Sequence, residues 1–101
     1  MIHKVSTTIV TVGNTLVLNC TADSVYPPSY SWKSGDQPIT NTSRVNVSSG
    51  GGGGGRSGLL LVRQVAYNDS GVYTCVATNS IGQDTADFPV VVQGGWILFV
   101  F

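Results

Sequence analysis

The sequence DSGVYTC, residues 69–75, decides the fold of this chain. It joins a turn-like segment, residues 67–71, to an alternating run over residues 72–78 in which Tyr73, Cys75 and Ala77 share one face. Because successive side chains of a strand point to opposite faces, the run predicts a strand with one buried face.

Short runs of the same kind fill the rest of the chain, with turn residues between them. No window has apolar residues at helical spacing together with a cap. The runs predict strands over residues 7–12, 15–21, 30–33, 37–40 (a weak edge segment), 44–48, 59–65, 72–78 and 86–93. Seven or eight short strands at this spacing favour a sandwich or a barrel.

Composition excludes several classes of function. The 101 residues suit one domain, and five basic with five acidic residues give zero net charge. No cluster of Lys and Arg is present of the kind that nucleic-acid or membrane-surface binding needs. His3 is the single histidine, so no Ser-His-Asp or Cys-His arrangement is available. We therefore expect no catalytic residue, no cofactor and no metal site.

The two cysteines, Cys20 and Cys75, lie 55 positions apart, which is neither a metal-site nor a redox-motif spacing. Two readings remain, a pair of free buried thiols or one disulfide. A bridge that closes a loop of this size would stabilise the fold by roughly 4 kcal/mol on the chain-entropy model. It would also place the chain in an oxidising compartment.

Cys20, Trp32 and the pattern Asp69-x-Gly71-x-Tyr73-x-Cys75 together resemble the signature of the immunoglobulin superfamily. The A-x-N-x-x-G continuation over residues 77–82 is similar to that of intermediate-set (I-set) domains, as in cell-adhesion molecules and receptor ectodomains. The resemblance covers residues 7–93. It implies an all-β, immunoglobulin-like Greek-key sandwich of two sheets, with a disulfide between Cys20 and Cys75 that joins them.

The resemblance also implies roles for single residues. Trp32 would pack against the bridge, Tyr73 would form the tyrosine corner, and Gly71 would serve the tight turn there. Leu60 would point inward, as would Val62 and Val65. Arg44 lies where such domains carry a basic residue that pairs with the Asp69 equivalent, and the alternative is a solvated Arg44 charge.

Domain boundaries follow from the same pattern. We expect one domain over residues 1–93 and an apolar C-terminal tail over residues 94–101. The tail is either the start of a truncated membrane segment, a cloning or readthrough tail, or a strand, since a bilayer span needs about 20 apolar residues. The six glycines over residues 50–55 predict a surface loop, lengthened naturally or by engineering.

Four sequons bear on the compartment. They begin at Asn19, Asn41, Asn46 and Asn68. Asn41, Asn46 and Asn68 are the candidates for glycosylation, whereas the sequon of Asn19 contains Cys20. Because no signal peptide opens the chain, an extracellular domain would be a fragment of a larger secretory-pathway protein, with Met1 as an added start.

The first function hypothesis is an extracellular module of a cell-surface receptor or adhesion protein. The resemblance implies a protein partner, homophilic or heterophilic, such as a neighbouring immunoglobulin-type domain. Its candidate contact surfaces are the segment Trp32–Ile39 and the loop Asn79–Asp84. A membrane would be met only through a transmembrane segment of the parent protein. The second hypothesis is a structural spacer in a matrix or muscle-type array, without a dedicated ligand.

Overall fold

The structure is a computed structural model that describes residues 7–21, 28–49 and 57–94. The glycine run and the apolar tail from residue 95 lie outside the described residues. The elements are β1 (Thr8–Thr11), β2 (Leu16–Thr21), β3 (Ser29–Ser34), β4 (Gln37–Pro38), β5 (Val45–Ser49), β6 (Ser57–Val62), the 3-10 helix η1 (Tyr67–Asp69), β7 (Gly71–Thr78) and β8 (Gln83–Gln93).

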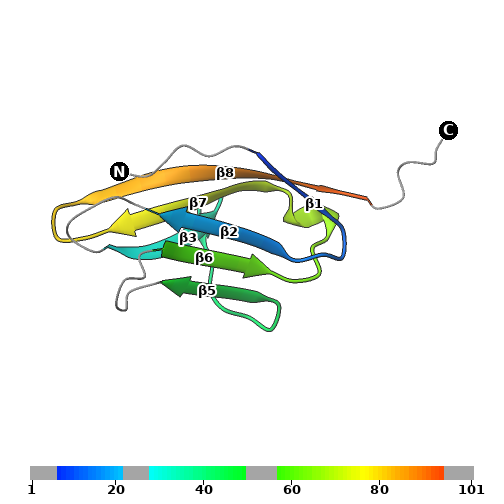
Figure 1. Cartoon of the computed structure of the whole chain (residues 1–101), viewed down its shortest axis with the longest axis horizontal. Coiled ribbons are helices and arrows are strands. Elements are labelled where there is room, and N and C mark those ends of the chain that lie inside the picture. Colours follow the sequence, from blue (N-terminus) through cyan, green and yellow to red (C-terminus); the bar gives the residue numbers. More distant parts are fainter. Residues whose placement is uncertain (1–6, 22–27, 50–56, 95–101) are drawn as a thin grey trace.

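The strands form two sheets that face each other (Figure 1). One sheet has five strands in the order β1-β8-β7-β3-β4, and the other has three in the order β2-β6-β5. β1 runs parallel to β8, with Thr8 opposite Val90, and the other neighbours pair antiparallel. The predicted all-β, two-sheet sandwich is confirmed.

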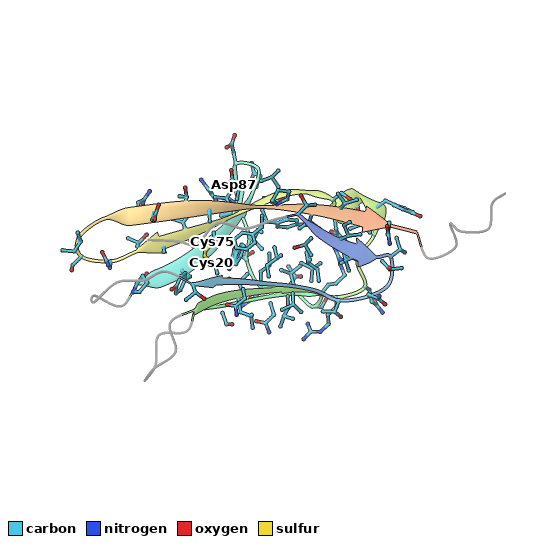
Figure 2. The ribbon with its side chains drawn as sticks, turned by 45° about the horizontal axis from the view of Figure 1, so that its top comes forward. Cys20, Cys75 and Asp87 are labelled. Atoms are coloured by element: carbon cyan, nitrogen blue, oxygen red, sulfur yellow. A yellow bond between two sulfur atoms is a disulfide. The ribbon has the colours of Figure 1, made fainter. Side chains whose placement is uncertain are left out.

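The core lies between the sheets and is built from the inward positions of alternating strands. β2 shows the pattern plainly, because Leu16, Leu18 and Cys20 are buried while Val17 and Asn19 are exposed. The predicted disulfide is present and joins Cys20 of β2 to Cys75 of β7 across the sandwich (Figure 2). The buried set is Leu16, Leu18, Cys20, Tyr30, Trp32, Leu60, Val62, Val65, Tyr73, Cys75, Ala77, Phe88, Val90 and Val92.

Trp32 fills the centre of this core. Its ring centroid lies 5.2 Å from that of Phe88, with the two planes tilted by 55°. On β3 it stands directly opposite Cys75 of β7, so its side chain shares the inward face with the disulfide. Its indole Nε1 is buried without a hydrogen-bond partner in the described part of the chain.

Several strand ends differ from the sequence prediction. β6 stops at Val62 instead of residue 65, because Gln64 takes a φ of 51° that breaks the extended backbone. Val65 still returns to the core, and its N–H and C=O bond to Asn14 O at 3.0 Å and to Gly13 N–H at 2.9 Å. The turn-like segment before β7 contains the 3-10 helix η1.

Two further strands of the five-stranded sheet, β8 and β4, also differ. β8 begins three residues earlier than predicted, because the hairpin with β7 pairs as far as Thr78 and Gln83. β4 is only two residues long and includes Pro38, which has no N–H to donate to a further strand. Both ends depend on pairing partners, which local composition does not reveal.

Gly58 is a residue that the sequence analysis did not single out. It lies on β6 opposite Cys20 of β2. A Cβ added there would stand 2.5 Å from Cβ of Tyr30 and 2.7 Å from its Cγ. Glycine therefore allows the two sheets to approach beside the disulfide, and a glycine inside a strand is the sequence signal for such an approach.

Candidate interaction surface

One end of the sandwich is held by a polar cluster around Asp69. Arg44 donates from Nη1 to Asp69 Oδ2 at 3.1 Å and from Nη2 to Oδ1 at 3.3 Å. A second Nη1 bond reaches Arg63 O at 3.0 Å. Arg44 and Asp69 therefore form an ion pair in the structure. From the sequence, this pair and a solvated Arg44 charge were equally open.

Asp69 also organises the corner before β7, through both its carboxylate and its backbone carbonyl. Asp69 Oδ2 accepts the Ala66 N–H at 2.8 Å, and the Tyr73 hydroxyl donates to Asp69 O at 2.6 Å. Gly71 follows with a φ of 147°, a region that favours glycine. Ser70 Oγ accepts the Val92 N–H at 2.9 Å, which ties the corner to β8.

Burial and charge act in opposite directions on the pKa values of this cluster. Burial alone raises the pKa of Asp69, but the hydrogen bonds from Arg44 and Ala66 and the charge of Arg44 outweigh it and lower that pKa. The hydrogen bond to Asp69 raises the pKa of Arg44. Burial, aided by the Asp69 charge, raises the pKa of Tyr73. The cluster therefore favours a charged Asp69–Arg44 pair.

Replacing Asp69 with Asn should destabilise the fold by about 1–2 kcal/mol at neutral pH, since the negative charge and one of the two oxygens that accept from Arg44 are lost. The folded pKa of Asp69 lies below its unfolded value of about 3.9. The contribution of its charge is therefore complete above that unfolded value and is lost as the pH falls through the folded pKa. Urea unfolding of wild type and Asp69→Asn from pH 7 to pH 2.5 measures this.

The difference between the two proteins should shrink at the acid end of that series. Arg44→Met is the matched partner variant, and it should remove most of the same pH dependence. A gap between wild type and Asp69→Asn that stays constant with pH would show that shape, and not charge, stabilises this corner.

The outer face of the five-stranded sheet carries an exposed apolar row. Ile9 of β1 stands beside Val91 of β8, and Val72 of β7 stands opposite Pro89 of β8. The exposed fractions are 62% for Ile9, 48% for Val72 and 47% for Val91. Because Pro89 and Val91 are two positions apart on one strand, the four side chains form one continuous row. We name it the Ile9–Val72 row.

Apart from half-buried Val76, the rest of this face is mainly polar. Thr74 Oγ1 donates to Asp87 Oδ1 at 2.8 Å, and Lys33 stands next to Thr74 on β3. The segment Trp32–Ile39, a candidate contact surface from sequence, turns Trp32 into the core and presents mainly polar residues outward. An apolar patch beside a polar rim is the usual anatomy of a protein interface.

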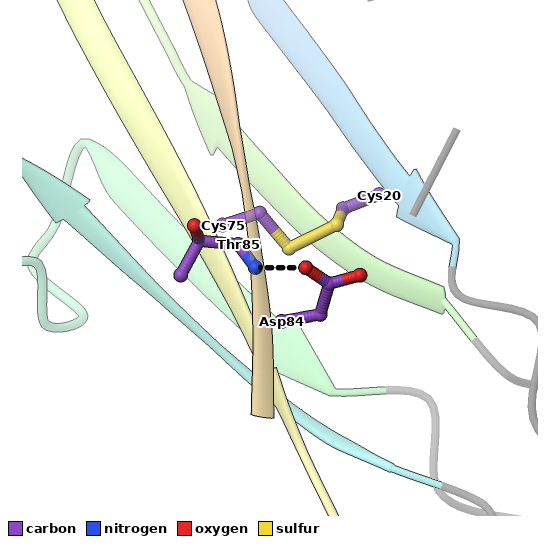
Figure 3. Close-up of a disulfide and its surroundings, with 4 residues drawn as sticks. All are labelled: Cys20, Cys75, Asp84 and Thr85. Carbon is purple, nitrogen blue, oxygen red and sulfur yellow. Dashed lines mark hydrogen bonds between the residues drawn. A yellow bond between two sulfur atoms is a disulfide. The ribbon is translucent and has the colours of Figure 1, made fainter. Parts of the chain in front are cut away.

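The second candidate segment, Asn79–Asp84, closes the hairpin between β7 and β8. Asn79 Oδ1 accepts the N–H groups of Ile81 at 2.8 Å and Gly82 at 3.1 Å. This turn presents Ile81 with 73% of its surface exposed. Beyond it, Thr85 N–H donates to Asp84 Oδ1 at 3.0 Å, beside the disulfide (Figure 3).

Sequence reasoning missed the Ile9–Val72 row. Val72 points outward because its neighbour Tyr73 points inward, and the alternation of the strand could have indicated this from the sequence. Val91 sits in the run Pro89–Val92, where no alternation distinguishes the exposed valine from the buried ones. Its proximity to Ile9 depends on the parallel pairing of β1 with β8.

The sequon asparagines are all exposed and are spread over the fold. Asn19 lies on β2, Asn46 on β5 and Asn68 in η1. Asn41 precedes β5, and its Oδ1 accepts the Val47 N–H at 2.6 Å. Within the described residues no three His, Cys, Asp or Glu side chains group as a metal site, and no helix is long and apolar enough to cross a membrane.

Comparison with known proteins supports the sandwich. The family model for "Immunoglobulin I-set domain" matches residues 1–92. Hemicentin-1 of Homo sapiens is 36% identical over 82 residues, which cover 81% of this chain and 1% of the relative. Hemicentin-2 of Mus musculus is 40% identical over 82 residues, covering 81% and 2%. The chain thus spans a very small part of the curated relatives it matches.

Among solved structures, the complex of titin M10 with the obscurin-like 1 immunoglobulin domain contains a similar chain. Its TM-score is 0.78 at 25% sequence identity, and the match covers 93% of this chain and 93% of that chain.

Proposed function

Because the chain belongs to the immunoglobulin I-set family, we propose that it is an extracellular module of a cell-surface receptor or adhesion protein. It acts by protein–protein recognition and not by catalysis. The observation that carries this proposal is the exposed Ile9–Val72 row, bordered by polar side chains on the same sheet face. The domain extends over residues 1–93, with residues 94–101 outside it.

The disulfide supports the extracellular compartment. Cys20 and Cys75 are both almost fully buried and joined to each other. Disulfides persist in oxidising compartments and are rare in the cytosol. Relatives among the adhesion and matrix proteins, the hemicentins included, are in keeping with this location.

The partner that the face suits is another immunoglobulin-type domain, either a second copy of this one or a different one. The face combines apolar side chains with hydrogen-bonding groups and few charges, so no nucleic acid and no membrane surface is expected to bind it. The similar chain is solved in a complex between titin M10 and the obscurin-like 1 immunoglobulin domain, which supports such a pairing here.

An avidity-based binding assay tests the proposal. The secreted domain is displayed as a multimer against an array of ectodomains with immunoglobulin-type domains, itself included. Val72→Asp and Val91→Asp should weaken the binding by about tenfold or more, because each buries a charge in the interface. Val17→Asp is the matched control, since Val17 is 53% exposed on the opposite sheet.

Circular dichroism verifies that all three variants stay folded. A wild type that binds none of the ectodomains contradicts recognition. Equal losses for Val17→Asp and Val72→Asp contradict the assignment to this face.

The second candidate function is a structural spacer in a matrix or muscle-type array without a dedicated ligand. The structural similarity to titin domain M7, which covers 92% of this chain, favours it. A spacer predicts that Val72→Asp changes no binding, so the same assay separates the two functions.

A further inference from the structure

The outer face of the three-stranded sheet differs in chemistry from the face that carries the Ile9–Val72 row. Its first cross-strand row runs from Val17 on β2 through Leu61 on β6 to Asn46 on β5. The second runs from Asn19 through Leu59 to Ser48. Apolar side chains thus occupy the middle strand, and the exposed residues that flank them are polar except for Val17.

Leu59 and Leu61 are half-buried. They point outward from β6 because they alternate along the strand with Leu60 and Val62, which point inward and are buried. Leu61 stands directly opposite Asn46, at a Cβ separation of about 5 Å for such a pair. A group attached to the Asn46 side chain would therefore meet Leu61 first and Leu59 next.

Asn46 and Ser48 form a complete acceptor motif on this face. In a strand, residues two positions apart point to the same side, so both face outward while Val47 packs against the core. β5 is the last strand of its sheet, so a bulky group on Asn46 has open space beyond the edge. Such a group would also discourage edge-to-edge pairing with another strand.

We propose that Asn46 carries an N-linked oligosaccharide that lies over Leu61 and Leu59 and closes this face to other proteins. The five-stranded face, with the Ile9–Val72 row, then remains as the open one. The inference rests on the proposed extracellular function, because the sugar donor belongs to the secretory pathway.

The chemistry is a glycosyl transfer. Asn46 Nδ2 forms a bond to the anomeric carbon of a lipid-linked oligosaccharide pyrophosphate. The bond between that carbon and the phosphate oxygen breaks, and the lipid pyrophosphate and one amide proton leave. The folded domain accepts the product because Asn46 is exposed.

The test uses the chain secreted from eukaryotic cells and mapped by mass spectrometry of its peptides. Sugar should occupy Asn46 in wild type and in Ser48→Thr, which keeps the acceptor motif. Asn46→Gln and Ser48→Ala should each lose one glycan. Ser48→Thr and Ser48→Ala change the same position and differ in whether the acceptor motif remains, so they form a matched pair. The peptide mapping also shows whether Asn19, Asn41 and Asn68 carry sugar.

A second readout tests the covering role. Fluorescence of the apolar dye ANS, which reports exposed apolar surface, should be higher for Ser48→Ala than for Ser48→Thr. Adding Leu61→Thr to Ser48→Ala should abolish that rise. Equal dye signals for the two position-48 variants would overturn the covering role even with sugar on Asn46.

The outcomes separate this inference from the proposed function. An unmodified Asn46 peptide in secreted protein with an intact disulfide overturns the inference and leaves the proposed function standing. Free thiols at Cys20 and Cys75 in the secreted protein overturn the extracellular function, whatever Asn46 carries.

Discussion

The double variant Cys20→Ala with Cys75→Ala is expected to lose roughly 4 kcal/mol of unfolding free energy. The bridge closes a loop with a sequence separation of 55 and joins β2 of one sheet to β7 of the other. Without it, the unfolded chain gains the conformational freedom that the cross-link removes. Because native domains are stable by only about 5–15 kcal/mol, such a loss removes a large fraction of the stability of the fold.

Guanidinium unfolding of the oxidised wild type, the reduced wild type and the double variant measures this effect. The reduced wild type and the variant should agree, and both should show a steeper dependence on denaturant, because their unfolded states expose more surface. A loss below about 1 kcal/mol would contradict the chain-entropy account for this bridge.

The Trp32→Ala substitution should lower the free energy of unfolding by about 3–5 kcal/mol, which is the range for removing a large aromatic side chain from a core. Trp32 is 1% exposed, packs on Phe88 and shares its face with the disulfide. Each of these contacts lies between the two sheets, so the cavity falls where neither sheet can easily close it.

Trp32→Phe is the informative control, because it keeps an aromatic ring and removes the buried Nε1–H, which has no hydrogen-bond partner among the described residues. A buried donor without a partner destabilises the fold by about 1–3 kcal/mol. Removing it should therefore offset part of the stability that Trp32→Phe loses through poorer packing. Thermal and urea unfolding of the three proteins give the comparison. A Trp32→Phe cost equal to that of Trp32→Ala would contradict the role assigned to ring packing.

The fold was predictable because its decisive information is local. The inward set Leu16, Leu18 and Cys20 and the inward set Tyr73, Cys75 and Ala77 can each be identified by alternation alone. The resemblance to immunoglobulin domains then related the two sets to each other through the disulfide. Neither step required knowledge of strand pairing.

The candidate surface was less predictable because it depends on register. Ile9 and Val91 are far apart in the chain and meet only through the parallel β1–β8 pairing. Gly58 matters only because Tyr30 approaches it from the other sheet. For Arg44, alternation says nothing about its partner, and only the folded position of Asp69 brings the two charges together. The use of Asn41, Asn46 and Asn68 stays a prediction.

The parallel alignment of β1 and β8 has a mechanical consequence. Thr8, Ile9, Val10 and Thr11 pair in register with Val90, Val91, Val92 and Gln93, and both strands run in the same direction. Tension applied through the chain ahead of Thr7 and behind Gly94 would therefore pull the two strands past each other along their length. The hydrogen bonds of this ladder would be sheared together and not peeled one by one, so rupture under load would demand more force than equilibrium stability alone suggests.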